Sequence, residues 1–491
     1  MGQEISLTPG ASADMNEFSQ GLREETSLLA RWFQDGRFAS CSDGHTVGLE
    51  LEMWLVDQKF EPLPENKKFL ESMADPMVVP ELSKFNAELN SQPELVGSGC
   101  LERVAQGLKE SWKRIQGTME TLNGHMLAIG TLPTIRDPLL TVDHMSDFDR
   151  YRALNEYVLH LRRGKPLQLS IEGRDQVHAV HHDIMLEAAA TSFQVHIQPP
   201  YELMTATFNA AVVASFASVG LAANSPFLLG ADLWDETRIP LFEQAICLPG
   251  FTRLDGTRQQ RVTFGSDYVQ ESLMELFWEN AHGYPVLLPI ATDKPPDQLS
   301  HVALQNNTIW RWNRPVIGFG VDGKPALRVE HRVMSAGPTL EDMVADLAFV
   351  LGLCHDLAPR LQKPHEFLPF GEARNNFYAA AKDGLKSRVC WGGRDNVLLQ
   401  TLILEELLPA ARRGLKSLKI SEDEISHYLD RIIQPRVTSM QTGASWQRQW
   451  VADHGKDWNA LTSAYFENQE SGRPVHTWKL GLIYADAPGS K

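Results

Sequence analysis

The segment from Thr46 to Asp57, TVGLELEMWLVD, constrains the fold of this chain more than any other. Its apolar residues recur at every second position, which predicts a β-strand with one buried face. Glu50 and Glu52 share the opposite face with Trp54, so two carboxylates point in one direction about 7 Å apart. Like charges at this spacing repel each other unless a cation lies between them. For an isolated Glu-x-Glu, a solvated strand face is the simpler interpretation.

Three later segments repeat this pattern, with an apolar strand face opposite a face that carries charged or imidazole side chains. They are FNAELN at 85–90, SFQVHI at 192–197 and ALRVEHRVM at 326–334. Each alternates with period two, which predicts a strand. Together with the first strand, and with one acidic residue just before the second strand, they collect Glu50, Glu52, Glu81, Glu88, His196 and Glu330. Their recurrence on separate strands favours one common site over scattered solvated faces.

The collected side chains predict a site for cations and phosphate. Glutamates gathered on one face of a sheet repel one another strongly unless cations neutralise them. Mg²⁺ suits them because it prefers oxygen ligands and the phosphates of a substrate. Arg328 and Arg332 lie beside Glu330 and add the positive charge that holds a transferring phosphoryl group. No GxxxxGK[ST] sequence occurs, so the pattern predicts metal-assisted phosphoryl transfer from a nucleotide on an antiparallel sheet.

Composition and charge exclude several classes of partner. The formal net charge of −16 argues against a nucleic-acid surface and gives no reason to expect attraction to anionic lipid. The sequence has neither a secretory signal pattern nor a run of about 18 apolar residues. Its five cysteines are widely scattered, as expected for free thiols in a reducing compartment. We therefore expect a soluble cytoplasmic protein with small-molecule substrates and no nucleic-acid or membrane partner.

The order of the patterns predicts one large unit in three parts. Residues 1–45 form a helical lead-in, whose amphipathic segment 15–35 is expected to cover the sheet. Residues 46–340 form an α+β body, with an irregular and mobile substrate loop expected at 232–264. Residues 341–491 are predicted to be helical and packed on the body, because no Pro/Gly/Ser-rich linker precedes them. The predicted fold class is therefore α+β, with a largely antiparallel sheet covered by helices.

Several motifs, taken together and in order, are similar to those of a known enzyme family. They are GLELE at 48–52, ELSKFNAELN at 81–90, SFQVHI at 192–197, ANSPF at 223–227, WRWNRP at 310–315 and RVEHR at 328–332. ARNNFYAAAKDGL and TGASWQRQ at 442–449 are similar to its C-terminal signature. On these motifs the sequence resembles the second type of the glutamate–cysteine ligase family, carboxylate–amine ligases related in fold to glutamine synthetase. The resemblance covers about 46 to 450.

The resemblance implies a curved, glutamine-synthetase-like sheet and the use of ATP and Mg²⁺. In that family ATP phosphorylates the γ-carboxylate of glutamate, and an amine such as cysteine then displaces the phosphate to form an amide. Arg332 is expected to steady the transferred phosphate, with Arg328 as a second catalytic residue. Arg332 and Arg314 are expected to bind the nucleotide, although Arg314 could instead bind a substrate carboxylate or close a surface ion pair. The metal ligands implied by the resemblance are Glu50, Glu52, Glu81, Glu88, His196 and Glu330.

Some alternatives stay open on the sequence alone. The chain departs from the family pattern at Asn90-Ser91-Gln92-Pro93 and at Val333-Met334-Ser335, which leaves the acid and the amine open. The same set of metal ligands would also suit a phosphotransferase similar to the guanidino kinases. A non-catalytic nucleotide-binding protein is a third hypothesis. The HAVHHD segment at 178–183 has two histidines four residues apart, but it lacks HExxH, so a zinc site there is disfavoured.

Overall fold

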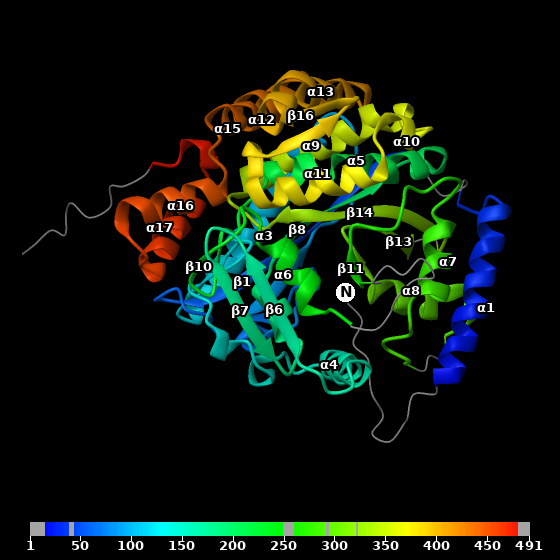
Figure 1. The fold of residues 1–491 in the computed structure, drawn as a ribbon, viewed down its shortest axis with the longest axis horizontal. Helices are drawn as coiled ribbons and strands as arrows, with labels where there is room; N and C mark the ends of the chain where they lie inside the picture. The colour runs from blue at the N-terminus through cyan, green and yellow to red at the C-terminus, as the bar shows by residue number, and fades with distance from the viewer. Residues whose placement is uncertain (1–14, 39–43, 249–259, 291–293, 321–322, 480–491) are drawn as a thin grey trace, which may run out of the picture.

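An antiparallel sheet forms the centre of the molecule (Figure 1). The computed structural model of the chain describes residues 15–38, 44–248, 260–290, 294–320 and 323–479. Within these residues eight strands form one sheet in the order β13-β14-β8-β1-β3-β2, with β4 and β5 paired to the two ends of β1. The strands are β1 (Thr46–Asp57), β2 (Val78–Pro80), β3 (Asn86–Asn90), β4 (Glu94–Leu95), β5 (Gly124–Leu127), β8 (Ser192–Gln198), β13 (Asn313–Phe319) and β14 (Pro325–Ser335). A curled antiparallel sheet with many helices confirms the predicted α+β class.

The other described strands form short two-stranded ribbons. They pair β6 (Leu167–Glu172) with β7 (Gln176–His181), β9 (Phe227–Leu228) with β10 (Ala231–Asp232), β11 (Val262–Thr263) with β12 (Trp310–Arg311), and β15 (Arg388–Trp391) with β16 (Arg394–Leu398). The β15–β16 ribbon lies among the C-terminal helices, and the sequence patterns do not predict it. Its strands are short, which leaves little alternation to detect.

Helices surround this sheet and make up most of the C-terminal part. The first eight are α1 (Met15–Gln34), α2 (Asn66–Met73), α3 (Cys100–Thr121), α4 (Asp149–Leu161), α5 (Met204–Leu221), α6 (Arg238–Ala245), α7 (Met274–Gly283) and α8 (Ser300–Asn307). The later ones are α9 (Leu340–Leu357), α10 (Pro364–Phe367), α11 (Phe370–Asp383), α12 (Leu399–Leu402), α13 (Leu408–Ser417), α14 (Glu422–Ile425), α15 (Gln434–Ser439), α16 (Gly443–His454) and α17 (Trp458–Glu470).

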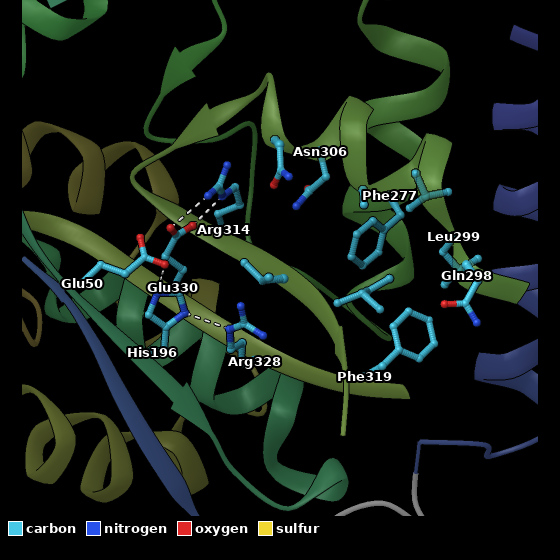
Figure 2. A pocket seen from close by; sticks show the side chains of 15 residues that line it. Glu50, His196, Phe277, Gln298, Leu299, Asn306, Arg314, Phe319, Arg328 and Glu330 are labelled. Carbon is cyan, nitrogen blue, oxygen red and sulfur yellow. Dashed lines mark hydrogen bonds and ion pairs between the residues drawn. The ribbon is translucent and has the colours of Figure 1, made fainter. Parts of the chain in front are cut away.

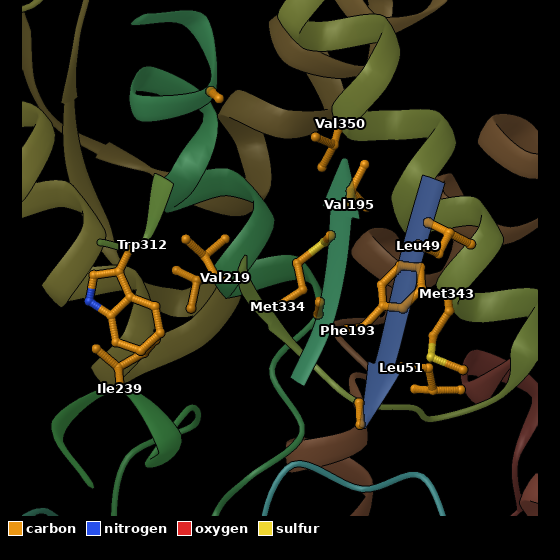
Figure 3. Close-up of a cluster of buried hydrophobic side chains, with 14 of the residues drawn as sticks. Leu49, Leu51, Phe193, Val195, Val219, Ile239, Trp312, Met334, Met343 and Val350 are labelled. Atoms are coloured by element: carbon orange, nitrogen blue, oxygen red, sulfur yellow. The ribbon is translucent and has the colours of Figure 1, made fainter. Parts of the chain in front are cut away.

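The two faces of β1 have opposite surroundings. Leu49 and Leu51 lie on its apolar face, next to Phe193 and Val195 of β8, and all four side chains are buried. They pack with Met343 and other apolar residues of α9 (Figure 3). Truncating one such leucine to alanine typically costs about 2–5 kcal/mol. Because side chains alternate along a strand, this anchored apolar face turns the even-numbered residues of β1 toward the opposite side.

Helix α5 is buried all around between the sheet and the C-terminal helices. It contacts β14 on one side and α9 and α11 on others. The segment Tyr201–Leu221 is long and apolar enough to cross a membrane by length and composition, but 83% of its apolar window is buried inside the fold. A helix that is apolar on every side is expected in the core of a large protein. Its composition is therefore explained by packing.

Helix α1 packs away from the sheet. It contacts α7, α8 and the short turn before α8, and Figure 1 shows it at the outer side of these two helices. The expectation that it covers the sheet is wrong. Its apolar stripe, which includes the buried Phe18, Leu22 and Leu29, has the period of any amphipathic helix and does not specify the partner.

The expected irregular loop at 232–264 contains regular structure. Helix α6 occupies residues 238–245, and most of its side chains are buried. Its short apolar stretch carries the charged Arg238 and Glu243, so the sequence lacks a clear helical period there. Residues 249–259, which belong to the same prediction, lie outside the described residues.

Candidate active site

Three strands bring one candidate metal-binding triad together. Glu50 of β1, His196 of β8 and Glu330 of β14 each offer a ligand atom, and these atoms lie within 4.8 Å of one another. Glu330 and His196 are directly paired across the two neighbouring strands, and β1 is the next strand beyond β8. The sheet register therefore fixes this triad, and the structure places all three sequence-predicted residues in it.

One ring nitrogen of His196 accepts a hydrogen bond, and the other has no well-aligned hydrogen-bond partner among the described residues. The Arg328 Nε donates a hydrogen bond to His196 Nδ1 at 2.9 Å, which orients the ring. The second ring nitrogen, Nε2, lies 3.0 Å from Glu50 Oε1. This buried Nε2 has no well-aligned hydrogen bond to any described residue. Figure 2 shows Arg328, His196 and Glu50 in a row along the cavity wall. A buried nitrogen without such a bond is the position at which a metal ion would satisfy the ring.

Arg314 forms a two-point ion pair with Glu330, its direct cross-strand partner. The Arg314 Nη2 donates to Glu330 Oε1 at 2.9 Å, and Nε donates to Oε2. Arg314 was expected either to bind a substrate or to close a surface ion pair, and the ion pair that it makes is buried. Its Nη1 is buried without a hydrogen-bond partner among the described residues, so one donor is left for a ligand in the adjoining cavity.

A second triad lies further along β1. Glu52, Glu81 and Glu88 also place carboxylate oxygens within 4.8 Å of one another. Glu52 is oriented by the backbone N–H of Ser192, at 2.6 Å, and by the Gln194 side-chain amide, at 3.0 Å. Glu81 follows β2 directly, outside any strand. All six side chains that were expected to ligate metal thus fall into two groups of three.

The pKa values show how crowded the second triad is with negative charge. Burial, together with the facing Glu88, raises the pKa of Glu52 to about 7, against the lowering influence of Arg332. Burial and the charges of Glu88 and Glu52 raise the pKa of Glu81 well above its usual value. Carboxylates whose ionised form is this unfavourable gain most from a bound cation. The donor set therefore fits a metal ion on the chemistry of the residues present.

In the first triad, neighbouring groups lower the pKa values of the two glutamates more than burial raises them. Burial works to raise the pKa of Glu330, but Arg314 and Arg332 outweigh it and lower the pKa below its usual value. Burial also works to raise the pKa of Glu50, but the contact with His196 and the charge of Arg314 lower it below its usual value. Both carboxylates are therefore ionised at neutral pH and available as ligands.

Arg332 lies between the two triads. Its Nη1 is 3.9 Å from Glu330 Oε1, and its guanidinium carbon lies 5.6 Å from the centre of the Phe242 ring. Its Nε has no hydrogen-bond partner among the described residues. Arg332 thus presents a donor to the site while an aromatic ring supports its planar group.

Sequence reasoning missed two charged residues beside this arginine. Glu187 lies in a 3-10 turn, Met185–Ala189, just before β8, and burial followed by the charge of Glu52 raises its pKa to about 8. Arg238 of α6 donates to the backbone carbonyls of Arg332 and Val333, at 3.2 and 2.6 Å. A short turn and a short helix carry no alternation, so no sequence signal marked either residue.

A cavity of about 210 Å³ opens from the first triad. One end is polar and is lined by Glu50, His196, Arg314, Arg328 and Glu330. The other end is lined by apolar side chains, with several amides between them, and its residues include Phe277, Leu299, Val302, Ile317, Phe319 and Asn306 (Figure 2). A pocket that is charged at one end and apolar at the other suits a ligand with phosphates and an aromatic base.

The histidine-rich segment is not a convergent metal group within the described part of the chain. His181 lies on the buried side of the β6–β7 ribbon, and its Nε2 is 2.9 Å from Asp137 Oδ1. His178 and His182 are exposed. The two groups whose ligand atoms converge are the triads on the sheet.

Comparison with known proteins gives the family. The family model of glutamate-cysteine ligase family 2 (GCS2) matches residues 46–461. The chain belongs to this family. The matched region contains both triads, the cavity and the helices behind the sheet. Glutamate-cysteine ligase family 2 is a family of carboxylate–amine ligases, so the protein is an enzyme that forms an amide bond.

One solved structure supports the fold of this glutamate-cysteine ligase family 2 member. A glutamate–cysteine ligase from Francisella tularensis in complex with AMP matches with a TM-score of 0.50 at 13% identity, covering 89% of this chain and 90% of that chain. A bifunctional glutathione synthetase from Pasteurella multocida matches with a TM-score of 0.49 at 10% identity, covering 90% of this chain and 54% of that chain. At such identities the likeness concerns the fold alone. The search of curated proteins gave no match.

Proposed function

We propose that the protein is an ATP- and Mg²⁺-dependent carboxylate–amine ligase that activates a side-chain carboxylate as an acyl phosphate. The acid is glutamate or a close analogue, and the acceptor is a small amine such as cysteine. The observation that carries this proposal is the pair of triads on one sheet face with Arg332 between them. Paired metal sites around a shared arginine suit a phosphoryl group passing from a nucleotide to a carboxylate.

Each triad would hold one metal ion. Glu50, His196 and Glu330 would bind the ion on the nucleotide side, because they line the cavity with the apolar end. Glu52, Glu81 and Glu88 would bind the ion on the acid side. Bound Mg²⁺ would neutralise phosphate oxygens and help to orient the two reacting groups. A set of carboxylates with a single imidazole suits Mg²⁺ or Mn²⁺ better than a thiophilic metal.

The nucleotide would lie along the cavity. Its base would occupy the apolar end near Phe277, Leu299 and Phe319, and its phosphates would point toward the first triad. The buried Arg314 Nη1 is one donor for these phosphates. The AMP complex of the Francisella ligase agrees with nucleotide use in a protein of this fold.

Arg332 would contact the transferring phosphoryl group. Its planar guanidinium can donate two hydrogen bonds in one plane to phosphoryl oxygens, and charge-assisted bonds of this kind strengthen as charge develops. Arg238 anchors the backbone carbonyls of Arg332 and Val333, where β14 has an irregular register against β8. The burial of both triads would also keep water away from the acyl phosphate, which hydrolyses readily.

Trapping of the acyl phosphate tests this function without knowledge of the amine. Enzyme incubated with ATP, Mg²⁺ and glutamate should yield γ-glutamyl hydroxamate when hydroxylamine is added. Without hydroxylamine it should yield pyroglutamate, because the α-nitrogen of glutamate captures its own activated carboxyl group. Mass spectrometry measures both products, and an Arg332→Ala variant serves as the background control. ADP release with glutamate and each of a panel of amines then identifies the acceptor.

Each alternative has its own outcome in this experiment. A phosphorylated guanidino product in place of an amide would assign a phosphotransferase. ATP binding by calorimetry, without hydroxamate, pyroglutamate or ADP from any tested acid, would overturn the ligase proposal in favour of a nucleotide-binding protein.

A further inference from the structure

Helix α1 lies outside the region matched by the family model, yet it is packed against two helices that line the proposed nucleotide cavity. The family match begins at residue 46, whereas α1 spans Met15–Gln34. The helix contacts α7 and α8, and both of these helices contribute residues to the cavity. Figure 1 shows α1 running along the outer side of α7 and α8.

Glu25 makes the central contact between α1 and α8. Glu25 is 1% exposed, and one of its carboxylate oxygens lies 2.7 Å from His301 Nδ1. The other oxygen accepts a hydrogen bond from the backbone N–H of Val302 at 2.9 Å. Both partners belong to the first turn of α8, where backbone N–H groups lack partners within the helix. An ionised carboxylate is well suited to such a helix start.

The cap that α8 would ordinarily carry is missing from its own sequence. The residue before the helix is Leu299, whose side chain cannot accept a hydrogen bond. Leu299 also has a φ of 50°, in the left-handed region that leucine rarely adopts. Such a conformation persists when surrounding contacts hold it in place. Leu299 is buried and lines the apolar end of the cavity.

The surface of α1 is shaped to receive His301. The Phe18 and His301 rings meet edge to face, with centres 5.0 Å apart. Gly21 lies so close to the imidazole that an added Cβ would be 2.6 Å from its ring atoms. An added Cβ would force the imidazole to shift, so glycine at this position leaves room for the histidine to reach Glu25. Phe18, Gly21 and Glu25 follow at helical spacing, so they present one continuous face to α8.

We propose that Glu25 is a positioning residue for the nucleotide, acting through α8. Its contacts hold the first turn of α8, and with it Leu299 and Val302, in the conformation that forms the apolar wall of the cavity. The inference rests on the proposed function, in which the base of ATP occupies this end. Glu25 itself does not line the cavity or contact either triad, so its effect is on nucleotide affinity and not on the chemical step.

The test compares two helix-capping glutamates. Glu25→Ala should raise the dissociation constant for ATP by on the order of tenfold, since a lost helix cap usually costs a free energy of that size. Calorimetry with MgCl₂ present measures the dissociation constant. The dissociation constant of Glu25→Gln should lie between those of wild type and Glu25→Ala, because the glutamine amide oxygen can still accept a hydrogen bond from the Val302 N–H. In both variants the KM for ATP should rise while kcat at saturating ATP stays near the wild-type value.

Glu424 provides the matched control. Its carboxylate accepts hydrogen bonds from the backbone N–H groups of Gly99, Leu101 and Glu102 at the start of α3, at 2.8, 2.9 and 3.3 Å. Like Glu25 it comes from a distant part of the chain, but it does not line the nucleotide cavity. Glu424→Ala should lower the melting temperature and leave the ATP dissociation constant unchanged.

The outcomes distinguish failure of this inference from failure of the proposed function. Wild-type affinity for ATP in a folded Glu25→Ala variant overturns the inference and leaves the proposed function intact. A wild-type protein that binds no ATP overturns both. If Glu25→Ala does not fold, hydrogen exchange of the wild-type protein decides: ATP should slow the amides of both α8 and α1, and unchanged exchange in α1 overturns the inference.

Discussion

Glu52 of β1 and Glu88 of β3 are direct cross-strand partners, so two carboxylates face each other at the closest position that a sheet offers. Like charges in this position destabilise a pair of strands. Both residues belong to the triad with Glu81, and because Glu88 is buried and Glu52 is half-buried, little water screens their charges. Repulsion between the two carboxylates therefore destabilises the metal-free protein, and a bound cation would remove this repulsion.

Glu52→Gln should therefore have opposite effects on stability and on activity. Removing one carboxylate relieves repulsion from Glu88, so the metal-free variant should melt at a higher temperature than metal-free wild type. The amide is a poor metal ligand, so ligase turnover should fall to background at any Mg²⁺ concentration. Calorimetric melting and ADP release measure the two effects. Near-normal turnover at saturating Mg²⁺ would rule out a catalytic metal held by Glu52.

Arg332→Lys should bind ATP nearly as well as wild type but turn over slowly. A single ammonium cannot reproduce the flat two-point contact of a guanidinium with phosphoryl oxygens. Losing one contact made mainly in the transition state costs roughly 3 kcal/mol, or about 10²-fold in rate. Single-turnover measurement of acyl phosphate formation reports the step directly.

Arg413→Lys is the matched control for this substitution. Arg413 also makes a two-point contact with a carboxylate, through Nε and Nη2 to Asp356 at 2.9 and 3.1 Å, but on the surface. Its replacement should leave the rate unchanged. If Arg332→Lys also retains the full rate, Arg332 acts only as a partner of Glu330.

Metal removal should lower the stability of the wild-type protein. A ligand that binds the folded state alone raises its stability by mass action. The melting temperature should therefore rise from EDTA to millimolar MgCl₂, and the rise should be smaller in Glu88→Gln and in Glu330→Gln. An equal rise in the wild type and in both variants would place the stabilising metal away from the triads.

Glu243 provides a pH-dependent test of the region beneath Arg332. Trp312 Nε1 and the Tyr378 hydroxyl donate to its Oε1 at 2.9 and 2.7 Å, but burial prevails and raises its pKa to about 7. The folded protein therefore keeps a proton that the unfolded chain releases at lower pH. The stabilisation is present below the unfolded pKa and is lost as the pH rises through 7.

Glu243→Gln should remove this dependence, because the amide stays neutral at every pH. Urea denaturation at pH 5 and pH 8 measures the difference in unfolding free energy between the variant and wild type. The unfolding free energy of the variant, relative to that of wild type, should be higher at pH 8 than at pH 5. A difference that is the same at both pH values would contradict the raised pKa.

Alternation along single strands predicted five of the six candidate ligands, all except Glu81, but not their arrangement. Period two was enough to place Glu50 and Glu52 opposite a buried face, since the apolar residues of β1 fix the orientation of the strand. The pairing of Arg314 with Glu330 depends on the register between β13 and β14, which one strand does not reveal. Glu187 lies in a short turn that has no period. The packing of α1 depended on a partner helix that hydrophobic periodicity alone does not identify.

The strand order β14-β8-β1 also determines when the sheet face that carries the two triads exists during protein synthesis. Translation delivers β1 early, then β8, and β14 only much later, so the first triad is incomplete until residue 330 has left the ribosome. Until then β8 presents an open edge, which is a template for unwanted strand pairing. Contacts so distant in sequence also form slowly. A nascent chain of this enzyme is therefore most vulnerable to aggregation between the emergence of β8 and that of β14.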